Sequence, residues 1–157
     1  IGKTIDTIKP IKNLVPFINE DRTQIIGTII YIDNYGNVVT NIKQGFFETI
    51  QKGRDFVISA RNNKFKTVYS KYSDVVNFEI PEEKRHDEGK GLVVFNSGGF
   101  LEIAVYRSNP NTVGTASSLM GLDLMDTVTI NFMATPIVPP VKETVGTLEG
   151  YRSWNTL

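Results

Sequence analysis

The chain alternates between short β-branched segments and polar corners. Residues 24–32, Gln-Ile-Ile-Gly-Thr-Ile-Ile-Tyr-Ile, form a nearly continuous apolar run, which is typical of a strand that is buried on both faces or wrapped into a barrel. The run ends at Asp-Asn-Tyr-Gly-Asn, residues 33–37, and residues 38–42 are again mainly apolar. Because Asp, Asn and Gly are turn residues, the pattern predicts two core strands joined by a turn.

The same reading predicts further short elements along the chain. A hairpin is expected around Arg61-Asn62-Asn63 because Asn tolerates positive φ, and a second around the tip Asn-Ser-Gly-Gly of residues 96–99. The remaining predictions are one or two helical turns at 45–50, hairpin strands at 55–60 and 64–69, strands at 92–95, 101–106 and 127–132, and a short helix within 111–120. Six or seven short strands with brief helical insertions indicate a mainly β fold, a small antiparallel β-barrel or closed sandwich with one or two short helices.

The ends of the chain differ from its middle. Residues 1–23 have irregular apolar spacing broken by Pro10 and Pro16, which predicts an interdomain linker. Residues 24–134 carry the predicted barrel, and residues 135–157, rich in proline at their start, are expected to form a C-terminal tail. Because the chain starts at Ile1 rather than Met, we expect it to be a piece or a processed form of a longer protein.

Composition supports this fold class and excludes several functions. Ile, Val and Thr make up 47 residues and Ala and Leu only 12, so strand formers dominate. The 17 basic and 17 acidic residues leave no net charge, which argues against a generic nucleic-acid binder. The absence of cysteine excludes disulfides and Cys-ligated metal sites. No apolar run approaches the roughly 20 residues that a membrane span needs, and no signal peptide is recognisable, which favours a soluble, cytoplasmic protein.

Standard catalytic signatures are mostly absent. The single histidine, His86, lies in segment 81–90, where seven of ten residues are charged, and we expect it to be exposed in a solvated loop. There is no phosphate-binding glycine loop, and we predict no metal site. Asp33, Glu102 and Asp126 are all expected near strand ends, but their spacing selects no pair of carboxylates.

Two polar corners interrupt the apolar strands. Residues 33–41 combine a carboxylate, an aromatic ring and three carboxamides, which can bind an ammonium, stack on a heterocycle and read a purine edge. The tip 96–99 offers a hydroxyl and open backbone N–H groups that can hold a carboxylate. Tyr72 adds a ring beside polar groups. Alternatively, the two corners only satisfy turn backbone and Tyr72 only packs on the barrel, and local chemistry alone favours this interpretation.

The order of these segments resembles a known family. Ile-Asp-Asn-Tyr-Gly-Asn-Val-Val-Thr-Asn-Ile (32–42), Tyr-Ser-Asp-Val (72–75), Asn-Ser-Gly-Gly-Phe-Leu-Glu-Ile-Ala (96–104) and Asp-Thr-Val-Thr-Ile (126–130) are similar to the C-terminal domain of the S-adenosylmethionine hydroxide adenosyltransferases, which include the fluorinase and chlorinase. The resemblance covers roughly residues 25–132. It implies a substrate site between the N-terminal domain of one subunit and this barrel of its neighbour, in a homotrimer.

The resemblance also implies roles for individual residues in binding S-adenosylmethionine as substrate, without a further cofactor. Asp33 would hold the methionine ammonium, Asn37 the adenine edge and Ser97 the methionine carboxylate. Tyr72 would pack on adenine, Tyr35 and Val39 would line the pocket, and backbone groups around Val105 and Arg107 would complete adenine recognition.

Two positions point to the nucleophile. Gly98 stands where halogenating members carry an arginine, and Val39 stands where they carry a tryptophan, which favours water over halide. The resemblance thus implies hydrolysis of S-adenosylmethionine to adenosine and methionine, with the water-activating residues in an N-terminal domain. This chain alone is then expected to bind poorly and to be inactive. The alternative is a non-catalytic β-barrel module that binds a nucleoside-like ligand or mediates assembly.

Overall fold

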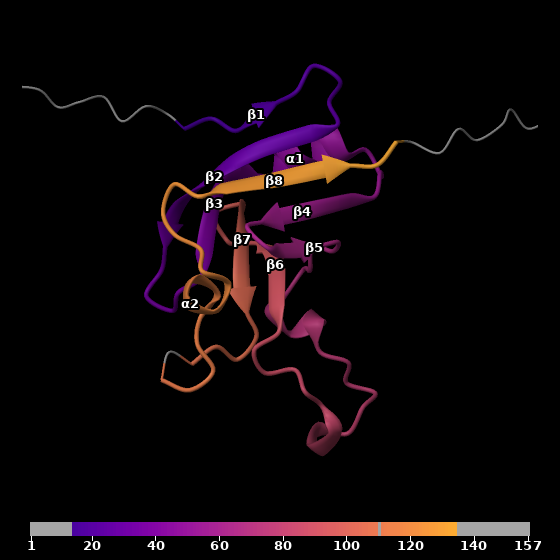
Figure 1. Cartoon of the computed structure of the whole chain (residues 1–157). Coiled ribbons are helices and arrows are strands. Elements are labelled where there is room, and N and C mark those ends of the chain that lie inside the picture. Colours follow the sequence, from indigo (N-terminus) through magenta and orange to yellow (C-terminus); the bar gives the residue numbers. More distant parts are fainter. Residues whose placement is uncertain (1–13, 110, 135–157) are drawn as a thin grey trace, which may run out of the picture.

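In the computed structural model, which describes residues 14–109 and 111–134, the chain forms an eight-stranded antiparallel sheet that nearly closes into a barrel (Figure 1). The strands are β1 (Phe17–Ile18), β2 (Gln24–Ile32), β3 (Val38–Lys43), β4 (Phe56–Ala60), β5 (Asn63–Phe65), β6 (Gly91–Phe95), β7 (Phe100–Val105) and β8 (Thr127–Phe132). Two α-helices, α1 (Gln44–Gln51) and α2 (Ala116–Met120), and two 3-10 helices, η1 (Tyr72–Val75) and η2 (Glu82–Lys84), complete this part of the chain. The predicted fold class is confirmed.

The long strand β2 connects the two halves of the barrel. Its first part, Gln24 to Thr28, pairs with β8, and its second part, from Ile29 onward, pairs with β3 in a ladder whose register shifts between Ile29 and Tyr31. Such an irregularity bends a strand and increases its twist. Figure 1 shows the result, with β2, β8 and β4 running across the molecule and β7 and β6 running down from them.

The two ends of the strand order, β5 and β6, are joined by the segment that follows β5. Tyr69 forms a single parallel bridge to Val94 of β6, and its backbone N–H donates to the carbonyl of Val93 at 2.8 Å. The predicted strand at 64–69 therefore ends early, at Phe65, because the chain leaves β4 to reach β6. This segment then continues into η1.

The core lies inside the barrel and is closed at one end by α1. Side chains from most strands are fully buried there, including Ile25, Ile58, Leu101, Ile103 and Ile130. From α1, Phe47 packs edge-to-face on Phe56 with ring centroids 5.1 Å apart. A second, smaller cluster on the outer face of β6 and β7 is covered by η1.

Most of the predicted elements are confirmed, and both hairpins form where expected. The additional strand is β1, a two-residue strand that pairs with β2 within the segment predicted to be a linker. The division into residues 1–23, 24–134 and 135–157 stays a prediction, and residues 1–13 and 135–157 lie outside the described part. Within the described part, no helix is long and apolar enough to cross a bilayer.

Candidate functional site

Both polar corners line one cavity of about 600 Å3 on the outer face of the barrel. Its floor is a row of side chains that lie opposite one another on four neighbouring strands, Tyr31 on β2, Val39 on β3, Glu102 on β7 and Val94 on β6. Because side chains on one strand alternate between faces, this row faces away from the core that holds Leu101 and Ile103.

The cavity is bordered by segments that are distant in sequence. Five of the nine predicted site residues line it: Asp33, Val39, Tyr72, Ser97 and Gly98. They come from the β2–β3 turn, from β3, from η1 and from the β6–β7 tip. The sequence pattern predicted these corners one by one, whereas the pairing of β3 with β7 and of β6 with β7 brings them to the same face.

The Asp33 carboxylate both stabilises the β2–β3 turn and borders the cavity. One carboxylate oxygen, Oδ1, accepts hydrogen bonds from the backbone N–H of Tyr35 at 2.8 Å and of Asn37 at 2.9 Å, and Oδ2 accepts from Asn37 Nδ2 at 3.0 Å. These hydrogen bonds are the ones expected from the alternative interpretation, in which Asp33 satisfies the backbone of the turn. The same side chain also borders the cavity, so it is held in a fixed position from which it can face a cation.

The β6–β7 tip is held by Asn96. Its Oδ1 accepts from the backbone N–H of Gly98 at 3.0 Å and of Phe100 at 3.1 Å, and its own backbone N–H donates to the Phe100 carbonyl at 2.9 Å. The hydroxyl-bearing Ser97 is exposed at this tip and lines the cavity. The N–H groups of Gly98, Gly99 and Phe100 are used within the loop, so the tip offers a carboxylate the hydroxyl of Ser97 as a donor rather than these N–H groups.

Glu102 is the site residue for which sequence reasoning selects no role. The sequence places it near a strand end, but it lies within β7 and is only 5% exposed. Its carboxylate accepts a hydrogen bond from the Tyr72 hydroxyl and one from Asn96 Nδ2. Burial raises the pKa of Tyr72 strongly, and the hydrogen bond to Glu102 and the negative charges of Glu102 and Asp33 raise it further, so Tyr72 remains a neutral donor. The sequence signal that could have identified Glu102 is an acidic residue inside the otherwise apolar strand 100–105.

The third carboxylate considered, Asp126, is not part of this site. It pairs with Arg61 at 2.9 Å, and the hydrogen bond from that guanidinium is the main reason why the pKa of Asp126 lies below its usual range. Its partners therefore mark it as a surface ion pair.

Four predicted site residues do not line the cavity. Tyr35 is 71% exposed, and the side-chain amide of Asn37 is bonded to Asp33. Val105 is buried at the end of β7. The Arg107 side chain faces Glu82 and Glu88 at 3.7 and 3.8 Å and borders a separate polar cavity of about 330 Å3, together with the exposed His86.

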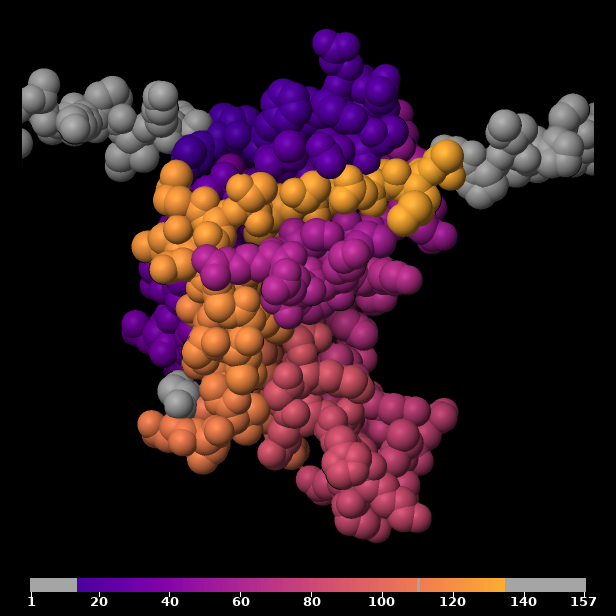
Figure 2. Space-filling model, viewed as in Figure 1, coloured from indigo at the N-terminus to yellow at the C-terminus, as the bar shows by residue number. Residues whose placement is uncertain are grey.

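This second cavity lies beside the charged segment 81–90. Figure 2 shows that part of the chain projecting from the body of the barrel, as expected for a solvated loop.

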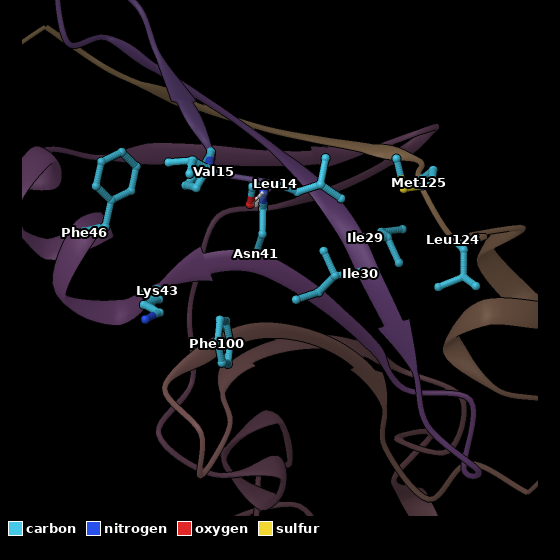
Figure 3. Close-up of a pocket in the computed structure, with 11 residues that line it drawn as sticks. Leu14, Val15, Ile29, Ile30, Asn41, Lys43, Phe46, Phe100, Leu124 and Met125 are labelled. Carbon is cyan, nitrogen blue, oxygen red and sulfur yellow. Dashed lines mark hydrogen bonds between the residues drawn. The ribbon is translucent and has the colours of Figure 1, made fainter. Parts of the chain in front are cut away.

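A larger, apolar groove of about 780 Å3 lies next to the candidate site and shares Phe100 with it. Figure 3 shows Phe46 and Lys43 at one end of this groove and Leu124 and Met125 at the other. Leu14 borders it, and Asn41 holds this residue in place by donating from Nδ2 to its carbonyl at 2.7 Å. The groove offers few groups with which to orient a polar ligand, which distinguishes it from the Asp33 cavity.

Comparisons with known proteins relate this barrel to others. A family model described as the SAM hydroxide adenosyltransferase C-terminal domain matches residues 27–129. The chain is similar to the crystal structure of an uncharacterized conserved protein from Thermotoga maritima, with 29% identity and a TM-score of 0.52, over 74% of this chain and 38% of that chain. It is also similar to the crystal structure of a conserved hypothetical protein from Thermus thermophilus, with 18% identity and a TM-score of 0.42, over 69% of this chain and 34% of that chain.

No curated protein matches the chain. The chain spans 38% and 34% of the lengths of the two solved structures. The family model extends from within β2 to within β8 and covers well over half of the chain, which shows that the chain belongs to the SAM hydroxide adenosyltransferases as a C-terminal domain.

Proposed function

We propose that the Asp33 cavity is the substrate-binding half of an enzyme that hydrolyses S-adenosylmethionine to adenosine and methionine in the cytoplasm. The observation that carries the proposal is that Asp33, Tyr72 and Ser97 border one cavity although they come from three separate segments. They supply a carboxylate for the substrate's ammonium, a ring for its base and a hydroxyl for its carboxylate.

The charge of the cavity supports a cationic ligand. Two carboxylates, those of Asp33 and Glu102, and one ammonium, that of Lys71, belong to residues that border it. S-adenosylmethionine carries an ammonium and a sulfonium, so a site with excess negative charge favours it over its neutral products. This difference helps the products to leave after the reaction.

The reaction itself is a displacement at the 5′ carbon. The oxygen of water forms a bond to C5′ while the bond from C5′ to sulfur breaks, the sulfur keeps the electron pair as the thioether of methionine, and the water loses a proton. Because a sulfonium is already a good leaving group, the protein mainly holds the carbon in line with the water and excludes other solvent. We place the groups that activate the water in an N-terminal domain of a neighbouring subunit in a homotrimer.

The two small residues of the cavity support water as the nucleophile. Val39 lies on its floor and Gly98 at its tip, and neither carries a group that binds a halide. We therefore assign the hydrolytic rather than the halogenating reaction to the complete enzyme.

A direct test compares this chain with the two-domain protein, in which it is joined to the family's N-terminal domain. Equilibrium dialysis with labelled S-adenosylmethionine should show tight binding only in the two-domain protein, and product analysis should show adenosine and methionine in a one-to-one ratio. Equal binding by the chain alone, without turnover in either form, would instead support a non-catalytic module that binds a nucleoside-like ligand.

The apolar groove predicts a second measurable effect, on assembly. We propose that the N-terminal domain of a neighbouring subunit covers this groove, because Phe100 connects the groove to the site that this domain completes. Leu124→Glu should raise the dissociation constant of the trimer at least tenfold, since burying a leucine contributes about 1.5–3 kcal/mol. Analytical ultracentrifugation of the two-domain protein measures this.

Leu119 provides a matched control for that substitution. Leu119 is 52% exposed and Leu124 is 54% exposed, but only Leu124 borders the groove. Leu119→Glu should leave the trimer intact. An equal loss of trimer in both variants, or in neither, would show that the groove is not the assembly surface.

A further inference from the structure

Glu102 is the only buried acidic residue in the described ranges 14–109 and 111–134. It occupies the cavity floor in the row formed with Val39 and Val94, at a place where apolar residues of β7 lie on either side of it in sequence. Burying a carboxylate is costly unless hydrogen bonds compensate for the lost water. The two oxygens of Glu102 therefore need partners, and the identity of those partners indicates what the residue does.

Each oxygen of Glu102 accepts from a different wall of the cavity. Oε1 accepts from the hydroxyl of Tyr72, in η1, and Oε2 accepts from Nδ2 of Asn96, at 3.1 Å, at the start of the β6–β7 tip. Tyr72 is 30 residues away in sequence and Asn96 is six residues away. The Glu102 side chain thus connects the Tyr72 ring to the tip that carries Ser97.

The orientation of Asn96 makes this arrangement specific for a carboxylate. Its Oδ1 is already used by the N–H groups of Gly98 and Phe100, so its Nδ2 must point at Glu102 and donate. Tyr72 also donates, because its raised pKa keeps the phenol protonated. Two donors converge on one residue, and a neutral amide at this place accepts from only one of them.

We infer that Glu102 is a positioning residue that fixes the spacing between Tyr72 and the Asn96–Gly99 tip, and thereby the distance between the base and methionine subsites. The inference rests on the proposed function for the identity of the ligand. Glu102 acts on the ligand through these two neighbours, because Tyr72 packs on the base and Asn96 holds the loop that carries the Ser97 hydroxyl for the carboxylate. Glu102 therefore determines specificity for ligands that carry both an adenine base and a methionine group.

The experiment uses the two-domain protein with Glu102→Gln, Tyr72→Phe and the double variant, with Glu83→Gln as the control. Glu83 is exposed and lies outside the candidate site, so the control makes the same chemical change without consequence for binding. Tyr72→Phe removes the same hydrogen bond without altering the sheet, so the inference remains testable when Glu102→Gln lowers folding yield.

Binding and kinetics give the first readout. We expect Glu102→Gln to raise the KM for S-adenosylmethionine about tenfold or more and to change kcat less, because a hydrogen bond to a charged group is lost. Tyr72→Phe should weaken the binding of adenosine but not of methionine. Glu102→Gln should weaken the binding of both, because the bond from Asn96 then also loses its charged acceptor. The double variant should bind no more weakly than Glu102→Gln, because the two changes remove the same bond.

The ionisation of Tyr72 gives a second readout, which is independent of the ligand. In the wild type, ultraviolet absorbance should show a tyrosine ionisation, absent in Tyr72→Phe, above the usual range of a tyrosine. Glu102→Gln should lower its pKa, because the negative acceptor is gone.

The two proposals can fail separately. If the wild type binds no S-adenosylmethionine, the proposed function is wrong, and an unchanged Tyr72 titration in Glu102→Gln would then also overturn the inference. If the wild type binds and Glu102→Gln binds equally well, only the inference is overturned. Additive losses in the double variant would likewise contradict it.

Discussion

Asp33→Asn in the two-domain protein should raise the dissociation constant of S-adenosylmethionine by about 10- to 100-fold, which corresponds to about 1.5–3 kcal/mol for a lost charge-assisted contact. The asparagine oxygen can still accept from the N–H groups of Tyr35 and Asn37, so the turn is kept while the charge is removed. The measurement is isothermal titration calorimetry. The loss should be large for S-adenosylmethionine and for methionine, and small for adenosine, which has no ammonium.

Two further variants complete this test. Ser97→Ala should also weaken the binding of S-adenosylmethionine, because the Ser97 hydroxyl is the side-chain group at the tip that can donate to a carboxylate. Asp55→Asn is the matched control, because Asp55 is exposed and does not line the cavity. Unchanged affinity in both Asp33→Asn and Ser97→Ala would mean that the cavity does not hold the substrate.

Gly36→Ala should lower the free energy of unfolding of this chain by about 3 kcal/mol or more, from the sum of left-handed backbone strain and overpacking. Gly36 has φ of +73°, and a Cβ there would lie 2.3 Å from Cβ and Oγ1 of Thr115, the residue that caps α2. The Gly36 carbonyl also accepts from the N–H of Ser117 at 3.0 Å. The turn and α2 are therefore packed together, and urea unfolding followed by circular dichroism measures the loss.

Gly53 separates the two causes of that loss. It also has φ of +73°, but no atom lies within 4 Å of the position its Cβ would take. Gly53→Ala should therefore cost only the backbone strain, about 1–2 kcal/mol. Equal losses at both glycines would contradict the contact with Thr115.

The strands could be predicted because their signal is local. The run 24–32 and the segment 127–132 carry β-branched residues between turn residues, and this pattern determines their type without knowledge of the partners. What the pattern does not contain is that β2 pairs first with β8 and then with β3. That change of partner, between Thr28 and Ile29, lies inside a nearly continuous apolar run rather than at a polar corner.

The candidate site was predictable only in part for the same reason. Asp33 and Ser97 lie at corners, and a corner is visible in sequence. Glu102 became meaningful only when Tyr72 and Asn96 were placed beside it, because the chemistry of a buried carboxylate is decided by its neighbours. Arg107 was predicted to contribute backbone groups to adenine recognition, and its side chain faces Glu82 and Glu88 rather than the cavity.

The central claim is that the cavity between the β2–β3 turn and the β6–β7 tip holds the substrate, and a crystal structure of the two-domain protein with S-adenosylmethionine tests it most directly. The account predicts the methionine ammonium within hydrogen-bond distance of Asp33, its carboxylate at Ser97 and the adenine against the Tyr72 ring. Substrate bound elsewhere, with the Asp33 cavity filled only by water or by another segment of the protein, would contradict it.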